Sequence, residues 1–85
     1  MVSCECADDE SRRRIGQVLR DFALECRTAG QSAWIILSTL RAAEVRDILK
    51  PNLATGETAL VALLAGHAAW HGFSTADEDW LLAHL

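Results

Sequence analysis

The sequence is short of several features that would place it in a known class of protein. It has one proline and no tyrosine, and it shows no repeat or low-complexity tract. Its most apolar run, residues 59–70, is about a dozen residues long, whereas a membrane-spanning helix needs about 20. The first ten residues, MVSCECADDE, are acidic, whereas a secretion signal begins with a basic region. These absences predict a cytoplasmic protein with no membrane span.

Basic residues and cysteines are also few. The 8 Lys and Arg residues against 12 Asp and Glu give a net charge of −4, so no general positive field would attract nucleic acid, and we do not expect it as a partner. Three cysteines cannot all pair within one chain, which argues against a disulfide-stabilised secreted scaffold. The sequence has no glycine-rich phosphate loop and no carboxylate pair in an apolar context. We therefore expect that the protein is not an enzyme.

Apolar residues, in contrast, are abundant. They make up 51% of the 85 residues. A chain of this size buries only about 60–65% of the surface that it exposes when unfolded. Part of the apolar excess must then lie on the surface, where a large patch usually marks a partner site. This composition predicts an oligomer or a subunit of a complex.

The spacing of apolar residues predicts an all-α fold. We expect an irregular acidic tail over residues 1–8 and one helical domain over residues 9–85, a compact bundle of four helices, or five if the second helix breaks near Ser38. The expected helices run from Asp9 to Thr28, from Gln31 to Lys50, from Thr55 to His71, and onward from a cap at Ser74 or Thr75. The third is rich in Ala and Leu and would lie at the centre. The segment AWIIL, residues 33–37, is compatible with a strand, but no other segment is an evident strand partner for it.

The first expected helix has two different faces. Its apolar stripe consists of Ile15, Val18, Leu19, Phe22 and Cys26. Arginines recur every seven residues on another face, at Arg13, Arg20 and Arg27, and Leu24 projects among them. An exposed leucine ringed by arginines would form a small contact patch for a protein, although a solvated face explains the same pattern.

The last expected helix supplies the other candidate partner-binding residues. Trp80 would be an interface anchor, since tryptophan buries more apolar area than other side chains, although a place in the core explains it as well. The acids Asp77, Glu78 and Asp79 would steer the protein toward a basic partner surface.

Two histidines could hold a metal ion. His67 and His71 lie four residues apart and would share one face of a helix, which suits zinc or copper. His84 and the pair Cys4 and Cys6 could complete such a site. Both His67 and His71 also continue the apolar stripe of the third expected helix, so packing explains the pair without a metal, and we expect no cofactor.

Together these features predict a non-enzymatic protein-binding module. It would be a small cytoplasmic regulator or inhibitor, of bacterial or phage type, that occupies the surface of another protein chain, such as a basic surface of a nucleic-acid-binding machine. That chain could be a second copy or a different protein. The alternatives are a helical oligomer that responds to zinc or copper and a small helical DNA-binding regulator.

Overall fold

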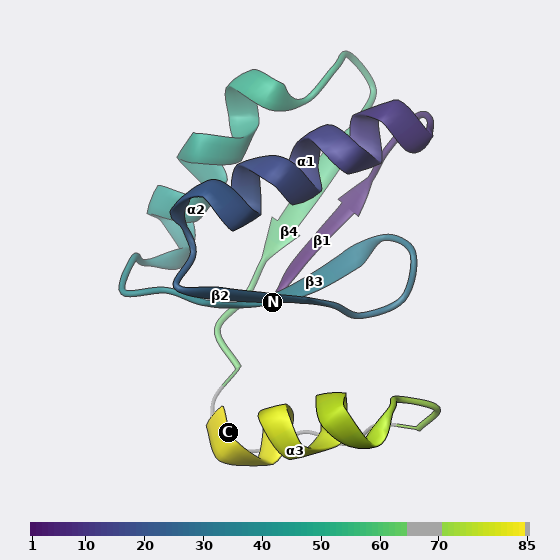
Figure 1. Cartoon of the computed structure of the whole chain (residues 1–85). Coiled ribbons are helices and arrows are strands. Elements are labelled where there is room, and N and C mark those ends of the chain that lie inside the picture. The colour runs from purple at the N-terminus through teal and green to yellow at the C-terminus, as the bar shows by residue number, and fades with distance from the viewer. Residues whose placement is uncertain (65–70, 85) are drawn as a thin grey trace.

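A sheet of four antiparallel strands forms the centre of the molecule in the computed structural model, which describes residues 1–64 and 71–84 (Figure 1). The elements follow in the order β1 (Val2–Glu5), α1 (Asp9–Phe22), β2 (Glu25–Thr28), β3 (Ala33–Leu37), α2 (Ala42–Leu49), a 3₁₀ turn (Lys50–Asn52), β4 (Thr58–Val61) and α3 (Thr75–His84). The expected all-helical bundle is therefore wrong, and the fold is mixed α/β.

The strands are not arranged in chain order. Across the sheet they lie as β2-β3-β1-β4, so β1 is central although it comes first in the chain. Val2 of β1 lies opposite Trp34 of β3 on one side and opposite Val61 of β4 on the other. The β-α-β-β-α-β order with these neighbours is the split βαβ arrangement of ferredoxin-like folds.

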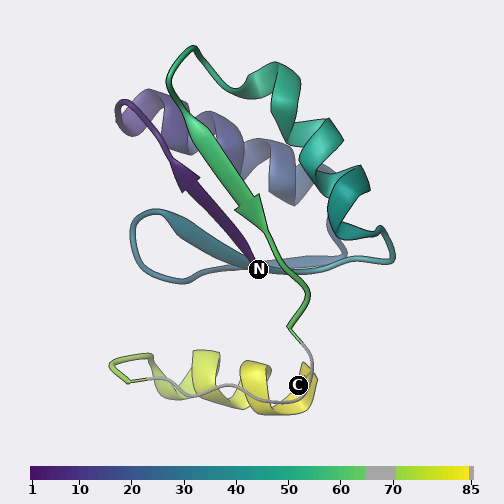
Figure 2. The same cartoon turned by 180° about the vertical axis from the view of Figure 1, so that it is seen from behind.

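Helices cover both faces of the sheet. The helices α1 and α2 pack on one face, and α3 lies against the opposite face, as the two views show (Figures 1 and 2). The main core lies between the sheet and the helices α1 and α2. Its buried residues are Val2, Cys4, Ile15, Leu19, Trp34, Val45 and Leu49.

The first helix begins as the sequence predicts but ends early. The Asp8 carboxylate accepts a hydrogen bond of 2.8 Å from the backbone N–H of Ser11 and so caps α1. Ile15 and Leu19 are fully buried, as the apolar stripe predicts. The helix ends at Phe22, not at Thr28, and Cys26 lies on β2 opposite Ile36 of β3. Cys26 fits the helical stripe and the alternation of a strand equally well, and pairing with β3 decides the outcome.

The second expected helix is wrong over its first half. Residues 33–37 form β3, and the chain then turns through Ser38 before α2 begins at Ala42. The break near Ser38 is therefore real, but a strand precedes it. The partner strands were hard to foresee because VSCE looks like an irregular tail and ECRT like the end of a helix.

The expectations of a third helix from Thr55 and of an irregular tail over residues 1–8 are both wrong, because parts of the two segments pair as strands. Thr58–Val61 forms β4, and each of its four residues pairs with a residue of β1. The helix propensity of Ala and Leu is worth only tenths of a kcal/mol per residue, so pairing with β1 outweighs it. Residues 65–70 of the expected helix lie outside the described part of the chain.

The last helix is confirmed. Ser74 caps α3, because its hydroxyl oxygen accepts from the Asp77 N–H at 3.2 Å and its carbonyl accepts from the Glu78 N–H at 2.9 Å. Among the helices of the described residues, none combines the length and the apolar character that a membrane span requires.

Candidate functional site

The strand β4 presents a sheet edge with no charge on it. Within the described residues its only neighbouring strand is β1. Residues 58–64, TALVALL, contain no ionisable side chain. Leu60 is 60% exposed and Leu63, just beyond the strand, is 86% exposed. We term residues 58–63 the β4 edge.

Among the described residues, no backbone group pairs with the outer side of this edge. The Ala62 N–H donates to the Met1 carbonyl at 2.9 Å, and the Met1 nitrogen donates back to the Ala62 carbonyl at 2.6 Å. Because backbone groups alternate along a strand, the N–H and C=O groups of Ala59 and Val61 point away from β1. The edge can therefore accept another strand without losing a bond to β1.

The opposite edge, β2, is charged and carries α3. Glu25 and Arg27 lie on the face of the sheet that α3 covers. The indole Nε1 of Trp80 donates to Glu25 Oε2 at 3.0 Å, and the Arg27 guanidinium carbon lies 5.6 Å from the centre of the Trp80 ring. Arg27 also forms an ion pair of 3.7 Å with Asp77. We term these contacts, with those of His84, the α3 latch.

His84 completes the latch. Its ring stacks on Trp80, with 4.5 Å between the ring centres. Its Nε2 lies 3.1 Å from Glu25 Oε2, and its Nδ1 lies 2.8 Å from the Trp80 carbonyl oxygen. Both ring nitrogens thus face oxygen atoms of neighbouring groups.

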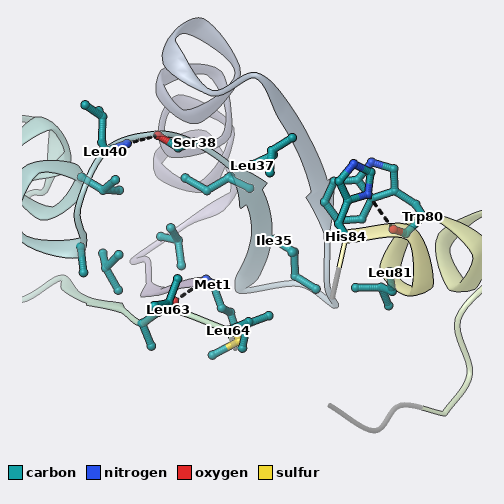
Figure 3. A pocket seen from close by; sticks show the side chains of 16 residues that line it. Met1, Ile35, Leu37, Ser38, Leu40, Leu63, Leu64, Trp80, Leu81 and His84 are labelled. Atoms are coloured by element: carbon teal, nitrogen blue, oxygen red, sulfur yellow. Dashed lines mark hydrogen bonds between the residues drawn. The ribbon is translucent and has the colours of Figure 1, made fainter. Parts of the chain in front are cut away.

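A hollow of about 260 Å³ opens between the latch and the end of the sheet where β3 and β4 finish (Figure 3). Its wall is mainly apolar and comes from Met1, Ile35, Leu37, Leu63, Leu64 and Leu81, among others. The Ser38 hydroxyl at its rim already accepts from the Leu40 N–H at 3.1 Å. A hollow with a mainly apolar wall and few polar groups suits contact with a protein better than binding of a polar metabolite.

The three thiols lie in or beside the core and are poor nucleophiles. Burial, together with smaller effects of the neighbouring Cys6 thiol and Glu57 carboxylate, raises the pKa of Cys4 to about 11. Burial also raises the pKa of Cys6 and of Cys26. A thiol reacts as its thiolate, so these three are held in their unreactive form at neutral pH.

The structure separates the residues of the predicted arginine face. Arg13 and Arg20 lie on α1, as expected. Arg27 lies on β2 in the α3 latch, so the three do not form one helical stripe. Leu24 is 68% exposed, in the short connection between α1 and β2.

The predicted residues of the last helix have partners within the chain. Trp80 is buried against β2 instead of facing solvent. Asp77 pairs with Arg27, Glu78 is half-buried, and Asp79 is exposed. The acidic patch on this helix is therefore engaged at one end and free at the other.

The predicted metal ligands are scattered. His67 lies outside the described residues, and His71 is exposed. Cys4 is buried in the core, while His84 belongs to the α3 latch. In residues 1–64 and 71–84, no three His, Cys, Asp or Glu side chains form a group that could hold a metal ion. The pair of His67 and His71 as zinc or copper ligands stays a hypothesis.

In comparisons with known proteins, the chain matches no family model, no curated protein and no solved structure. The surface of the molecule is therefore the guide to its function. The sequence did not indicate the β4 edge, because residues 58–63 fall within the third expected helix. The uncharged run of residues 58–64 was the signal that could have found it.

Proposed function

We propose that this chain is a non-enzymatic protein-binding module and that it binds a second copy of itself through the β4 edge. The observation that carries the proposal is an uncharged edge strand with two exposed leucines on or beside it. Natural proteins usually protect such edges with Lys, Pro, a bulge or a covering element, because an unprotected edge pairs with other chains. Neither lysine nor proline occurs between Thr58 and Leu64.

Symmetry favours a second copy as the partner. Two identical strands related by a two-fold axis pair antiparallel, and each copy then contributes the same patch. The outward backbone groups of Ala59 and Val61 would join the two sheets into one. Leu60 and Leu63 of each copy would lie at the junction and lose contact with water.

Charge supports the same site. Each copy carries a net charge of −4, so two copies repel each other over most of their surfaces. The β4 edge contributes nothing to that repulsion. Leu63 also lines the hollow, so a partner seated on the edge covers part of its rim.

The wider role that we propose is that of a small regulator or inhibitor that acts by occupying a protein surface. Its compartment would be the cytoplasm, a placement that the three free thiols support, since a reducing environment keeps cysteines unpaired.

The test is the mass of the protein in solution across a range of micromolar concentrations. Sedimentation equilibrium should give twice the chain mass of 9.3 kDa for the wild type. Leu60→Lys and Leu63→Lys should each weaken self-association by about 30-fold or more, because each change places two charges in the interface. Leu24→Lys is the matched control, since it changes an equally exposed leucine far from β4 and should leave the dimer intact.

A wild type that stays monomeric at every concentration overturns self-pairing. Equal weakening by Leu24→Lys would show that general surface apolarity, and not the β4 edge, causes the association.

A further inference from the structure

A second surface, on the other side of the molecule, has the chemistry of an anion site. A groove of about 240 Å³ lies between α1 and the hairpin of β2 and β3. The groove is lined by three arginines of α1 and by residues of the hairpin: Arg12, Arg13, Gly16 and Arg20 on α1, and Thr28, Gln31 and Trp34 on the hairpin. We term it the arginine–tryptophan groove.

Trp34 places an unused hydrogen-bond donor in this groove. The residue is only 3% exposed. Its indole Nε1 donates no hydrogen bond to any described residue, yet no fully buried side-chain nitrogen or oxygen of the described residues lacks a partner. The Nε1 thus has no partner among the described residues, and the groove is the hollow that Trp34 lines. A nearly buried indole whose N–H faces a groove is unusual, because such groups normally find a partner.

Gly16 brings that donor together with a guanidinium group. A Cβ placed on Gly16 would lie 3.4 Å from Trp34 Nε1 and 3.4 and 3.5 Å from the two terminal nitrogens of Arg20. Arg20 is one helical turn after Gly16, so its side chain folds back over the bare backbone at that position. The missing side chain leaves room for a ligand atom that touches both donors.

Two of the three arginines of the groove have no acidic partner among the described residues. Arg13 and Arg20 form no salt bridge within the described residues, whereas Arg12 pairs with Asp9 at 3.0 Å and donates to the Gln31 carbonyl at 3.3 Å. The Arg20 guanidinium and the Trp34 indole N–H thus lie close together, Arg13 lines the same groove, and all three groups are donors. A ligand that fits this set is a compact acceptor with a high negative charge.

We propose that the arginine–tryptophan groove binds the phosphoryl group of a small phosphorylated molecule or of free phosphate. Arginine binds phosphate through two parallel N–H donors, and the geometry is specific as well as strong. The groove volume is suited to a phosphoryl group with a small substituent, not to a large cofactor. A long polyanion is disfavoured, because Asp9, Glu10 and Asp21 flank the arginines on α1 and the whole chain is acidic.

The test is a titration of the ¹⁵N-labelled full chain, monitored through its indole N–H resonances. Trp34→Phe removes one resonance and so identifies it. Addition of inorganic phosphate to millimolar concentrations should move the Trp34 indole resonance in the direction of a stronger hydrogen bond, in a saturable way. Arg13→Gln and Arg20→Gln should each raise the Kd about tenfold or more, whereas Arg46→Gln, an exposed arginine on α2, should leave it unchanged.

A variant that keeps the fold provides the most direct test of the groove. Gly16→Ala places a methyl group between the donors at a helical position, where alanine is favoured over glycine. It should keep or raise the melting temperature and weaken phosphate binding about tenfold or more. A Gly16→Ala variant that binds phosphate like the wild type would contradict the site.

A second titration with adenosine 5′-monophosphate separates the two sources of the phosphoryl group. Equal Kd values for the nucleotide and for inorganic phosphate support recognition of the phosphoryl group alone, and tighter binding of the nucleotide supports a phosphomonoester. An unmoved Trp34 resonance with both probes overturns the proposal. So does a site that double-stranded DNA saturates while neither small probe does. These results are independent of self-association, because the β4 edge lies across the sheet from this groove.

Discussion

The two edges of the sheet solve the problem of an exposed strand in opposite ways. On β2, the residues of the face that α3 covers, Glu25 and Arg27, carry opposite charges, and both contact α3. On β4, the residues of the same face, Thr58 and Leu60, carry no charge. The described chain places no strand beyond β4. Charge on an edge strand prevents pairing with other chains, while an uncharged edge invites it. The molecule thus has one edge strand that is charged and holds the last helix, and one edge strand that is uncharged and, among the described residues, uncovered.

The largest expected effect comes from removing the main contact between α3 and β2. Trp80→Ala removes the buried indole of the α3 latch and its hydrogen bond to Glu25, and it should lower the free energy of unfolding by about 3 kcal/mol. Urea denaturation measures that loss, and amide exchange should show that α3 opens more readily. Leu82→Ala, at a position 68% exposed on the same helix, should cost about 0.5 kcal/mol or less.

The same Trp80→Ala variant sharpens the comparison. Glu25 and Arg27 still protect β2 when α3 is released, so the variant should not form larger assemblies than the wild type. Polymerisation through both edges would contradict the view that charge closes β2.

Blocking backbone pairing at the β4 edge should change the free energy of self-association by almost the same amount. Ala59→Pro removes an outward N–H from the β4 edge and leaves the bonds to β1 in place. Because a dimer loses two such donors, self-association should weaken by about 3 kcal/mol, or about a hundredfold. Sedimentation equilibrium measures the change, and Ala59→Gly, which keeps the N–H, should remain a dimer.

A smaller effect is expected from neutralising the latch. Glu25→Gln keeps the shape of the side chain but removes the charge that accepts from the Trp80 indole and lies 3.1 Å from His84 Nε2. The free energy of unfolding should fall by about 1 kcal/mol, since the carboxylate is partly exposed and water screens it. Asp79→Asn, at an exposed acid of α3 for which the described residues provide no hydrogen bond or ion pair, is the control for charge alone and should cost less. An equal loss in both variants would remove the special role of Glu25.

The smallest expected effect concerns the start of β4, where Glu57 ties the open edge to the rest of the sheet. Hydrogen bonds from the backbone N–H groups of Ala7 and Ala54, at 2.8 and 2.7 Å, lower the pKa of Glu57 from its ordinary value of 4.5. Its contribution to stability is therefore complete above about pH 4.5 and is lost as the pH falls through the lowered pKa of the folded state.

Melting temperatures measured between pH 6 and pH 3 should show this loss, and Glu57→Gln should reduce it by a few degrees. Part of the slope should persist, because the N–H of Ser11 also lowers the pKa of Asp8. A pH profile identical to that of the wild type would exclude a stabilising role for the Glu57 carboxylate.

The helix boundaries that depend on local chemistry could be predicted from the sequence. Asp8 and Ser74 are caps whose side chains bind the first turn of the helix that follows them, and both helices begin where those caps indicate. The buried positions Ile15 and Leu19 also follow from their spacing. Each of these features is decided within a few residues of the chain.

The strands could not be predicted in the same way. The segments VSCE, ECRT and TALV are four residues each, too short for a clear alternation, and the last is rich in helix-forming residues. Their structure depends on partners that lie up to 59 positions away, such as Val61 opposite Val2. The site was missed for the same reason, because an edge exists only once a sheet has been recognised.

The central position of β1 has a consequence for how the chain acquires its structure. Of these four strands, β1 is synthesised first, and it can pair only after its neighbours β3 and β4 have been made. Its pairing with β4 closes a loop of more than 50 residues. Contacts over such sequence distances slow folding, because the entropy of loop closure is lost before the contacts form. Until β4 arrives, β1 itself is an open edge. A shortened chain without β4 would therefore keep that edge, and aggregation of such fragments during synthesis is the hazard that this strand order creates.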